Sequence, residues 1–352
     1  MKMNIYKKRT ISLLAAAIFI PLFFIGSSLL LDPAEIYHKS FFRKDCSPYK
    51  SVTLLVGRIN HHLDGHNGVL FGSSLSTNFE TPYLLEQTGI NFFKAARDGV
   101  GAKAMDKIVR YVLNKDKQQN LKTVWWELYH QKMTDDDFIR RNFPTYLFND
   151  DFSDDLPYLL SFSTIKKGID VIRGKCVPAT VDITAWRYDE RHRKSQEKFH
   201  QRVDEINQNI RLQQRRLSDY SFQPAEVPAL DNYVLPVVRS NPDRTFVFYV
   251  PPVSLAALAS FKTDELNRFF TMIKRLADEG KTNPNVKVYL PVWNKDVITD
   301  GRLYRDGLHY VGSINDLIVQ DIVAGKYLAT PDNFEAFVQD LTDWIKHEQM
   351  RK

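Results

Sequence analysis

The segment Gly68–Ser76, GVLFGSSLS, decides the fold and holds the first candidate for chemistry. Three apolar residues run into Gly72, and two serines follow before Leu75. This pattern predicts a short buried strand that ends in a tight turn, with a small hydroxyl side chain at the carboxyl end of the strand. Catalytic and ligand sites of open α/β sheets lie at that end of their strands, so we expect the functional site at this turn.

Strand and helix patterns alternate along the chain beyond this turn. Apolar runs bounded by turn residues predict four more strands, at Ile90–Ala96, Leu121–Leu128, Thr245–Val250 and Asn285–Leu290. Amphipathic patterns predict helices at Thr77–Gly89, Ala102–Asn114, Thr263–Gly280, from about Ser313, and at Phe334–His347. The alternation indicates an α/β domain over residues 68–352, in which a doubly wound, five-stranded parallel sheet lies between two helix layers.

One long region breaks the alternation. Residues 133–240 are predicted to be a mostly helical insertion, in which Trp186–Tyr220 forms a long charged helix. The apolar seam of this helix suits packing on its own domain or on a partner, and we expect the former. Residues 32–67 are predicted to connect the N-terminal segment to the α/β domain. A cluster in this connection is interpreted as a solvated polar loop rather than a metal site: His61, His62, Asp64 and His66.

The N-terminal region carries a membrane signal. Residues 11–31 contain no charged side chain, and at about 1.5 Å per residue this length spans a hydrocarbon core of about 30 Å. The basic group Lys7–Arg9 precedes this stretch and acidic residues follow it. We therefore expect a cytoplasmic tail at residues 1–10 and everything after residue 32 outside the cytoplasm. An uncleaved signal anchor is expected, and the alternative is a cleaved signal peptide.

The composition is that of a globular protein with a basic surplus. The 352 residues carry a formal net charge of +6 without a nucleic-acid-binding motif, which favours an anionic membrane or wall polymer over nucleic acid. The two cysteines, Cys46 and Cys176, are too few for a structural zinc site. They could pair outside the cytoplasm, and their spacing leaves this disulfide open.

A second candidate stretch, Asp306–His309, follows the last predicted strand. A serine hydroxyl attacks an acyl carbon when a base takes its proton, and imidazole suits that task near neutral pH. The base in turn needs an acceptor for its other nitrogen, and the Asp306 carboxylate, three residues before His309, is within reach. The first and last strands deliver their loops to the same sheet edge, so we expect Ser74 to meet His309 there as a Ser–His–Asp triad.

Both stretches resemble blocks of the SGNH, or GDSL, hydrolase superfamily. GSSLS at Gly72–Ser76 resembles the GDSLS block, with Ser73 in place of the usual Asp. DGLH at Asp306–His309 resembles the DxxH block. The resemblance implies an SGNH-like fold in which Ser74 is the nucleophile and the second block supplies the acid and the base.

The oxyanion hole is the incomplete part of this resemblance. The superfamily implies backbone N–H donors from Ser74 and from a glycine after the second strand, which is either Gly99 or Gly101. The GxND loop after the third strand is missing, since residues 126–130 read WELYH. Losing one such donor costs roughly 10²–10³ in rate. This departure favours a narrow acyl-transfer role over general esterase activity.

Three neighbours of the site are weaker candidates for substrate binding. Ser73 adjoins the nucleophile in the sequence. Arg97 is interpreted by default as a member of a surface ion pair, in a position where it could also meet an anionic substrate. Glu127 is interpreted as a residue at the rim of the site.

The arrangement as a whole resembles the D-alanyl transfer protein D family of bacterial envelopes and related anchored SGNH proteins that act in O-acylation of surface glycans. The resemblance implies a single-pass protein of the bacterial cytoplasmic membrane with its catalytic domain on the periplasmic side. It would transfer an acyl group through a Ser74 acyl-enzyme to hydroxyls of an envelope polysaccharide or teichoic-acid-like polymer. A multi-span membrane O-acyltransferase is the implied partner, and no cofactor is expected.

Two other functions stay open at this point. The first is a membrane-anchored carbohydrate O-acetyl esterase, which uses the same triad with water as the acceptor. The second is a non-catalytic SGNH-fold scaffold that binds a glycan or the membrane O-acyltransferase.

Overall fold

The computed structural model describes residues 5–39, 41, 46–47, 52–128, 143–175, 177–178 and 220–350. The chain divides into two compact units. Unit 1 comprises residues 1–64 and 143–183, and unit 2 comprises residues 65–142 and 184–352.

Unit 2 is built on a five-stranded parallel sheet, as predicted. In chain order the strands are β2 (Gly68–Phe71), β3 (Phe92–Lys94), β4 (Thr123–Glu127), β6 (Thr245–Tyr249) and β7 (Val286–Tyr289). Their order across the sheet is β3-β2-β4-β6-β7, and every neighbouring pair is parallel. Most strand residues are buried, which is the pattern of a parallel sheet covered on both faces.

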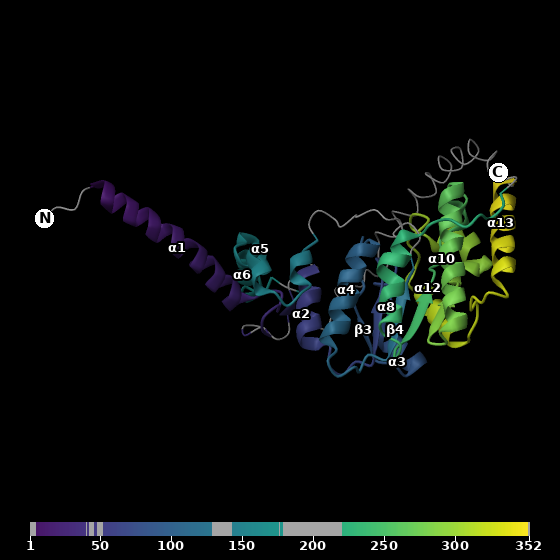
Figure 1. Cartoon of the computed structure of the whole chain (residues 1–352), viewed down its shortest axis with the longest axis horizontal. Coiled ribbons are helices and arrows are strands. Elements are labelled where there is room, and N and C mark those ends of the chain that lie inside the picture. Colours follow the sequence, from purple (N-terminus) through teal and green to yellow (C-terminus); the bar gives the residue numbers. More distant parts are fainter. Residues whose placement is uncertain are drawn as a thin grey trace. The chain divides into compact units, whose positions relative to one another are not determined.

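The strand order reverses at β2, which lies between β3 and β4. Because crossovers between parallel strands are right-handed, the helix after β2 covers one face of the sheet and the helices of the later connections cover the other. The first is α3 (Thr81–Thr88), and the others are α4 (Ala102–Lys115), α8 (Leu235–Arg239) and α10 (Thr263–Thr282), which lie side by side in Figure 1. Ligands of this architecture bind outside the carboxyl ends of the strands at such a reversal.

The limits of α3 follow from the local sequence. The helix ends at Gly89, whose φ of +69° is left-handed and whose N–H donates to the Leu85 carbonyl, so the predicted C-cap is confirmed. It begins at Thr81, four residues later than predicted, because residues 73–79 form turns instead. Pro82 occupies the first turn of the helix, where the missing N–H of proline costs nothing.

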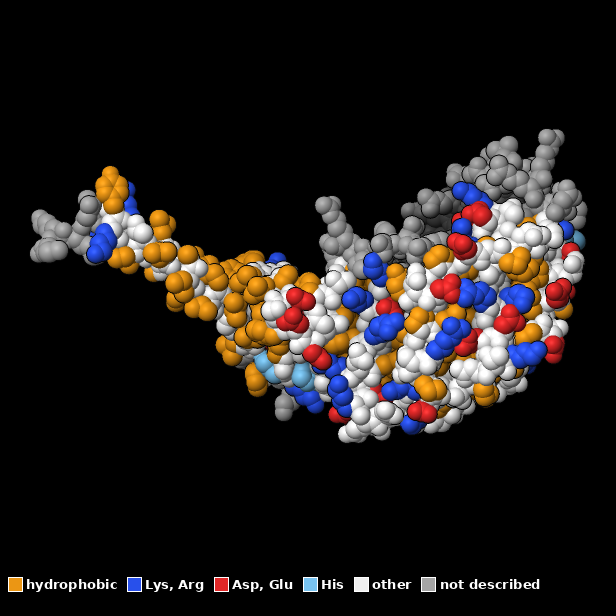
Figure 2. Space-filling model, viewed as in Figure 1, with side chains coloured by type: hydrophobic (Ala, Val, Ile, Leu, Met, Phe, Trp, Pro, Cys, Tyr) orange, Lys and Arg blue, Asp and Glu red, His pale blue; other side chains and the backbone are white. Residues whose placement is uncertain are grey.

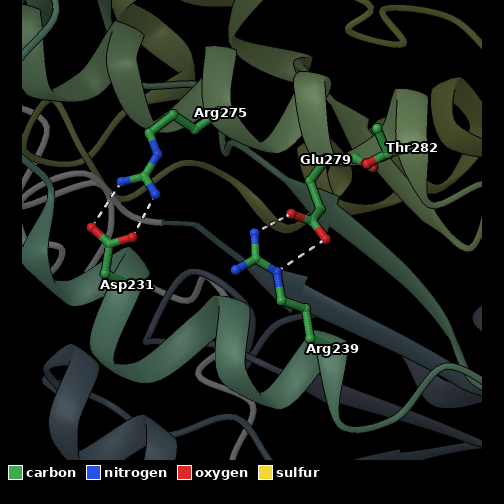
Figure 3. A network of polar contacts seen from close by, with 5 residues as sticks. All are labelled: Asp231, Arg239, Arg275, Glu279 and Thr282. Carbon is green, nitrogen blue, oxygen red and sulfur yellow. Dashed lines mark hydrogen bonds and ion pairs between the residues drawn. The ribbon is translucent and has the colours of Figure 1, made fainter.

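Two ion pairs tie α10 to the segment before β6 (Figure 3). This segment consists of the π-helical turn η5 (Leu230–Val234) and α8. Arg275 donates from two guanidinium nitrogens to Asp231, and Arg239 donates to Glu279 at 2.6 Å. The carbonyl of Glu279 also accepts from the Thr282 hydroxyl. These pairs are largely solvent-exposed, so each contributes at most about 1 kcal/mol, and apolar packing holds the layer.

The remaining described helices of unit 2 are short pieces around β7 and two long helices at the end of the chain. They are α9 (Leu255–Leu258), η6 (Pro291–Trp293), α11 (Lys295–Thr299), η7 (Gly301–Leu303), α12 (Gly312–Val323) and α13 (Phe334–Met350). The predicted starts of the last two helices, at Ser313 and Phe334, agree with the structure to within one residue. Helix α12 packs against α3, and α13 packs against α9 and α10.

Unit 1 combines the N-terminal helix with part of the predicted insertion. Its elements are α1 (Ile5–Leu31), β1 (Cys46–Ser47), α2 (Val52–His62), η2 (Thr145–Leu147), η3 (Phe152–Asp155), α5 (Leu156–Leu159), α6 (Phe162–Ile172) and β5 (Val177–Pro178), and β1 pairs antiparallel with β5.

Helix α2 lies within the predicted connecting segment and corrects the interpretation of His61 and His62 as part of a solvated loop. Leu54, Leu55 and Ile59 form a buried apolar side of this helix, so the segment contributes to a core. His61 and His62 end the helix rather than lying in a loop. In the part of the chain that the structure describes, no group of three or more His, Cys, Asp or Glu side chains is placed to hold a metal ion.

The end of α1 belongs to the core of unit 1. The carboxylate of Asp32 is fully buried and accepts hydrogen bonds from the Tyr37 N–H at 2.7 Å and the Tyr158 hydroxyl at 2.9 Å. Gly168 of α6 lies against Leu31, and a Cβ at position 168 would meet the Leu31 side chain at 2.6 Å. The last turn of α1 therefore packs closely against residues of the insertion.

Helix α1 is long and apolar enough to cross a membrane over Tyr6–Leu31, with a mean hydropathy of 2.4. Its side chains are mostly exposed, which is consistent with a signal anchor or a signal sequence.

Two predictions fall on residues that the structure does not describe. The predicted helix Trp186–Tyr220 lies outside the described residues except for Tyr220. The same holds for Cys176 and for the side chain of Cys46, so the disulfide stays a prediction.

Candidate active site

The turn after β2 presents one serine. The N–H of Ser76 donates to the Ser73 carbonyl at 3.1 Å, which begins a series of turns over residues 73–79. Within residues 71–79 every residue is buried except Ser74, which is half-buried. Gly72 is required at the entry to the turn, because a Cβ there would overlap the side chain of Ser76.

The second predicted stretch forms a tight loop between η7 and α12. Tyr304 and Tyr310 form an antiparallel bridge across the base of this loop, and the Arg305 N–H donates to the His309 carbonyl at 2.8 Å. Both tyrosines are buried, so the base of the loop is fixed in the core. The loop therefore holds the backbone of His309 firmly.

The tip of the same loop orients the carboxylate of Asp306. Gly307 adopts a φ of +81°, and its carbonyl accepts from the Ser254 N–H at 2.9 Å. Asp306 Oδ1 accepts from the N–H of His309 at 2.8 Å and from the N–H of Leu308 at 3.2 Å. These backbone hydrogen bonds fix the orientation of the Asp306 carboxylate toward the imidazole.

The three predicted residues come together. Ser74 Oγ lies 2.8 Å from His309 Nε2, and His309 Nδ1 lies 2.8 Å from Asp306 Oδ2 and 3.0 Å from Oδ1. These are the distances of a serine–imidazole–carboxylate relay. Ser74 and His309 meet although 235 residues separate them in the sequence.

The electrostatics of the acid favour its ionised form. Burial alone would raise the pKa of the Asp306 carboxyl, but the hydrogen bonds from the His309 ring, the His309 N–H and the Leu308 N–H outweigh it and lower that pKa below its usual value. Near neutral pH this group is therefore a carboxylate, which favours the Nδ1–H tautomer of His309 and places the acceptor nitrogen, Nε2, against Ser74.

A buried glutamate holds the serine turn. Glu127, at the carboxyl end of β4, accepts from the backbone N–H of Ser73 at 3.1 Å and from the hydroxyls of Ser73 and Ser76. The Ser76 hydroxyl also meets the Tyr249 hydroxyl of β6 at 2.5 Å. Glu127 is only 6% exposed, so the interpretation of this residue as part of the rim is wrong: it lies beneath the turn.

The Ser73 side chain is also buried beneath the turn, in contact with Glu127. It is 7% exposed and faces Glu127, in the place where the GDSLS block has an aspartate. Burial raises the pKa of the Glu127 carboxyl, while the hydrogen bonds from Ser73 and Ser76 oppose this rise. The turn therefore rests on a buried acid supplied by β4.

Lys94 and Asn315 fix the far side of the turn. The buried ammonium of Lys94, in β3, donates to the carbonyl oxygens of Thr77 at 2.7 Å and Phe79 at 2.9 Å. The side-chain amide of Asn315, in α12, donates to the Leu75 carbonyl at 3.0 Å. Strands β3 and β4 and helix α12 therefore converge on the backbone around Ser74. Lys94 and Asn315 were not predicted, and Glu127 was predicted at the rim of the site rather than beneath the turn.

The predicted oxyanion glycines lie in the loop between β3 and α4. The Arg97 N–H donates to the Gly72 carbonyl at 2.8 Å, which ties this loop to the start of the serine turn. Gly99 takes a left-handed φ of +66°, and Gly101 is the N-cap of α4 in extended conformation. Both glycines are thus in the loop next to the turn, and the choice between their N–H groups stays open.

The loop after β4 in which the superfamily carries an asparagine falls largely on residues 129–142, outside the described part of the chain. No protein-family model matches the chain, and no curated protein is similar to it. The fold is that of a five-stranded parallel α/β protein.

Proposed function

We propose that the protein is a serine acyltransferase of the bacterial cell envelope, with Ser74 as nucleophile, His309 as general base and acid, and Asp306 as the group that orients the imidazole. One observation carries the proposal: the continuous contact from Ser74 Oγ through His309 to the Asp306 carboxylate, at 2.8 Å for each step. Ser74 is also the half-buried residue of a turn whose other residues, 71–73 and 75–79, are buried.

In the first half-reaction, Ser74 Oγ attacks the acyl carbonyl carbon of the donor while His309 Nε2 takes the hydroxyl proton. The tetrahedral intermediate collapses with cleavage of the bond to the leaving group, which takes the proton back from His309. The product is an ester between the acyl group and Ser74. Backbone N–H groups of Ser74 and of Gly99 or Gly101 are the proposed donors to the oxyanion.

In the second half-reaction, an acceptor hydroxyl replaces the leaving group. His309 Nε2 takes the proton of that hydroxyl as its oxygen attacks the Ser74 ester. Collapse forms the new ester on the acceptor, and the proton returns to Ser74 Oγ. Water in place of the acceptor makes the same protein an O-acetyl esterase.

Transfer is favoured over hydrolysis by what lies at the end of β4. The strand ends in Glu127, whose carboxylate is occupied by Ser73 and Ser76, where the superfamily continues to an asparagine donor. One oxyanion donor fewer slows attack by water and by an acceptor hydroxyl alike. We therefore favour a reaction in which a bound donor and a bound acceptor offset that loss by proximity.

The proposed setting is the outer side of the bacterial cytoplasmic membrane. Support comes from α1, a single N-terminal apolar helix that could anchor the protein in a membrane. The proposed acceptor is a hydroxyl of an envelope polysaccharide or teichoic-acid-like polymer, with Ser73, Arg97 and Glu127 no more than neighbours of its binding site. A multi-span O-acyltransferase is the proposed source of the acyl group.

The test uses the full chain in detergent with p-nitrophenyl acetate. We expect one acetyl group on Ser74 by intact mass and peptide mapping, with slow turnover, and no label in Ser74→Ala. Asp306→Asn should slow labelling by about 10⁴, because the amide favours the wrong imidazole tautomer. A variant of a buried hydroxyl in the same turn, Ser76→Ala, controls for loss of the turn itself and should keep Ser74 as the labelled residue.

The outcomes separate the candidate functions. Rapid turnover that Ser74→Ala abolishes would make the protein an esterase. Labelling that is unchanged in Ser74→Ala and in Asp306→Asn would contradict a catalytic role for the triad and favour the scaffold.

A further inference from the structure

Unit 1 carries an apolar surface that its own core does not use. Helix α6 buries Thr164, Ile165, Gly168 and Val171. Other large apolar side chains of α5, α6 and the two-residue link between them remain exposed: Leu156 at 46%, Leu160 at 42%, Phe162 at 69%, Ile169 at 38% and Ile172 at 43%. We call these five residues the α5–α6 face. Contiguous exposed apolar surface of this kind marks an interaction site.

The α5–α6 face is regular rather than scattered. Phe162, Ile169 and Ile172 are seven and ten residues apart, so they lie on one side of α6. Leu156 and Leu160 are four residues apart, so they lie one above the other at α5. The acidic residues of η3 precede Leu156, and Asp170 is paired with Lys175 at 4.0 Å.

The position of this face relative to α1 indicates what covers it. Both α5 and α6 pack against α1, and Gly168 brings α6 against Leu31, the last residue of the apolar helix. Figure 2 shows hydrophobic side chains along α1 and on the adjoining surface of unit 1. Leu31 is the last residue of the apolar stretch. If α1 crosses a lipid bilayer, the lipid that surrounds its end therefore also contacts the side chains of α6.

The charges beside the face fit the same medium. Lys166 and Arg173 are exposed. Because they follow Phe162 by four and eleven residues, they lie along one border of the α5–α6 face. Long basic side chains at such a border keep their apolar stems on the hydrocarbon and extend their charges to anionic headgroups. A helix with an apolar side and a basic border lies in the plane of a membrane interface.

We propose that the α5–α6 face is embedded in the outer leaflet of the lipid bilayer, beside the point where α1 leaves it. Unit 1 then has two membrane contacts: α1 across the bilayer, and α5 with α6 in the interface. The occupant of the face is lipid acyl chain rather than a second protein. The inference needs α1 in the bilayer, but it does not depend on the chemistry of Ser74.

The test places p-benzoyl-phenylalanine at single positions of the full chain, reconstituted in nanodiscs of phosphatidylethanolamine and phosphatidylglycerol. Position 162 replaces one aromatic residue by another, and position 169 tests the same side of α6. Position 19, an exposed phenylalanine in the middle of α1, is the positive control. Position 167 is the matched negative control, because Lys167 is exposed on the other side of α6.

After irradiation, mass spectrometry identifies the adducts. We expect lipid adducts at positions 162 and 169 in yields comparable with the yield at position 19. The yield of lipid adduct at position 167 should be much lower. Lipid adducts at position 19 alone would overturn the inference and leave the anchor intact. No lipid adduct at any of these positions would overturn both. Irradiation in native membranes that captures a protein at position 162, in place of lipid, would also overturn it.

Discussion

At the scale of single residues, the unusual feature is that the turn around Ser74 is held by a buried acid. Glu127 accepts one backbone N–H and two hydroxyl groups from the residues around Ser74, and it reaches them from β4 rather than from the turn itself. The GDSLS block carries an acid within the turn, whereas this chain carries Ser73 there. The acid beneath the turn comes from the neighbouring strand β4.

The buried carboxyl of Glu127 makes stability depend on pH. Its pKa is raised in the folded protein, so its contribution to stability is complete below the pKa of an unfolded glutamate and is lost as pH rises through the folded-state pKa. Glu127→Gln cannot ionise. Relative to the natural protein, we expect the variant to gain about 1.4 kcal/mol for each unit of displacement of that pKa, as pH rises from the unfolded-state pKa through the folded-state pKa.

Thermal melts of both proteins at a series of pH values measure this difference. Tyr249→Phe is the control, since it removes a hydroxyl from the same network without removing a charge. Parallel stability curves for Glu127→Gln and the natural protein would contradict the prediction.

Gly72 gives a second prediction at this scale. A methyl group at this position would overlap Ser76 and come within 2.8 Å of Glu127 Oε2, so Gly72→Ala should displace the turn. We expect a loss of about 1–3 kcal/mol in the free energy of unfolding and loss of acetyl labelling at Ser74. Gly312→Ala, where the added methyl meets nothing within 4 Å, should stay within about 0.5 kcal/mol of the natural protein. Normal labelling of Gly72→Ala would show that the turn tolerates the methyl.

At the scale of elements, β3 supplies a cation to the other side of the same turn. Lys94 is 3% exposed and binds two carbonyl oxygens that precede α3. Lys94→Met keeps the apolar length of the side chain and leaves these carbonyls without the ammonium. We expect a loss of about 1.5–3 kcal/mol in the free energy of unfolding. The matched control is Lys287→Met in β7, an exposed strand lysine, which should change stability by less than about 0.5 kcal/mol.

Equal losses for the two lysine variants, measured by chemical denaturation of the full chain, would contradict this assignment. A selective loss would identify β3 as a support of the site as well as a strand of the sheet.

The sequence predicts the secondary-structure elements better than it predicts the contacts between them. All five strands of the sheet were predictable, because short apolar runs between turn signals are typical of buried parallel strands. The late start of α3 was signalled by Pro82, which belongs in the first turn of a helix, but the pattern from Thr77 onward hid it. Helix α2 was not predicted, although its buried apolar residues have helical spacing, because the helix is short and ends in polar residues.

The candidate site divides in the same way. Ser74, His309 and Asp306 were predictable, because residue type and topology together bring them to one edge. The buried, anchoring positions of Glu127 and Lys94 were not, because a charged residue at a strand end has no local pattern that tells burial from exposure. The sign that was available is that Glu127 directly follows Trp126 in an otherwise apolar strand, where an unpaired charge would be costly.

At the scale of the whole molecule, the end of α1 is part of a folded unit. Ser28 and Asp32 are fully buried, and Asp32 binds Tyr37 and Tyr158. Removal of α1 would open this core, so we expect the mature protein to keep the helix. Intact mass of protein purified from membranes should correspond to the chain with residues 5–31 present. A mass that begins after Leu31 would show that α1 is a signal sequence.

Unit 1 also has a consequence for biosynthesis. Its two parts, residues 1–64 and 143–183, are separated in the chain by residues 65–142 of unit 2. At about 5–20 residues per second, the ribosome needs on the order of ten seconds to pass from the first part to the second. During this interval α5 and α6 have not been synthesised, so α2 and the end of α1 lack these packing partners. The nascent chain therefore passes through a stage in which Asp32 has no Tyr158 to bind, and a chaperone or the export channel is expected to shield it there.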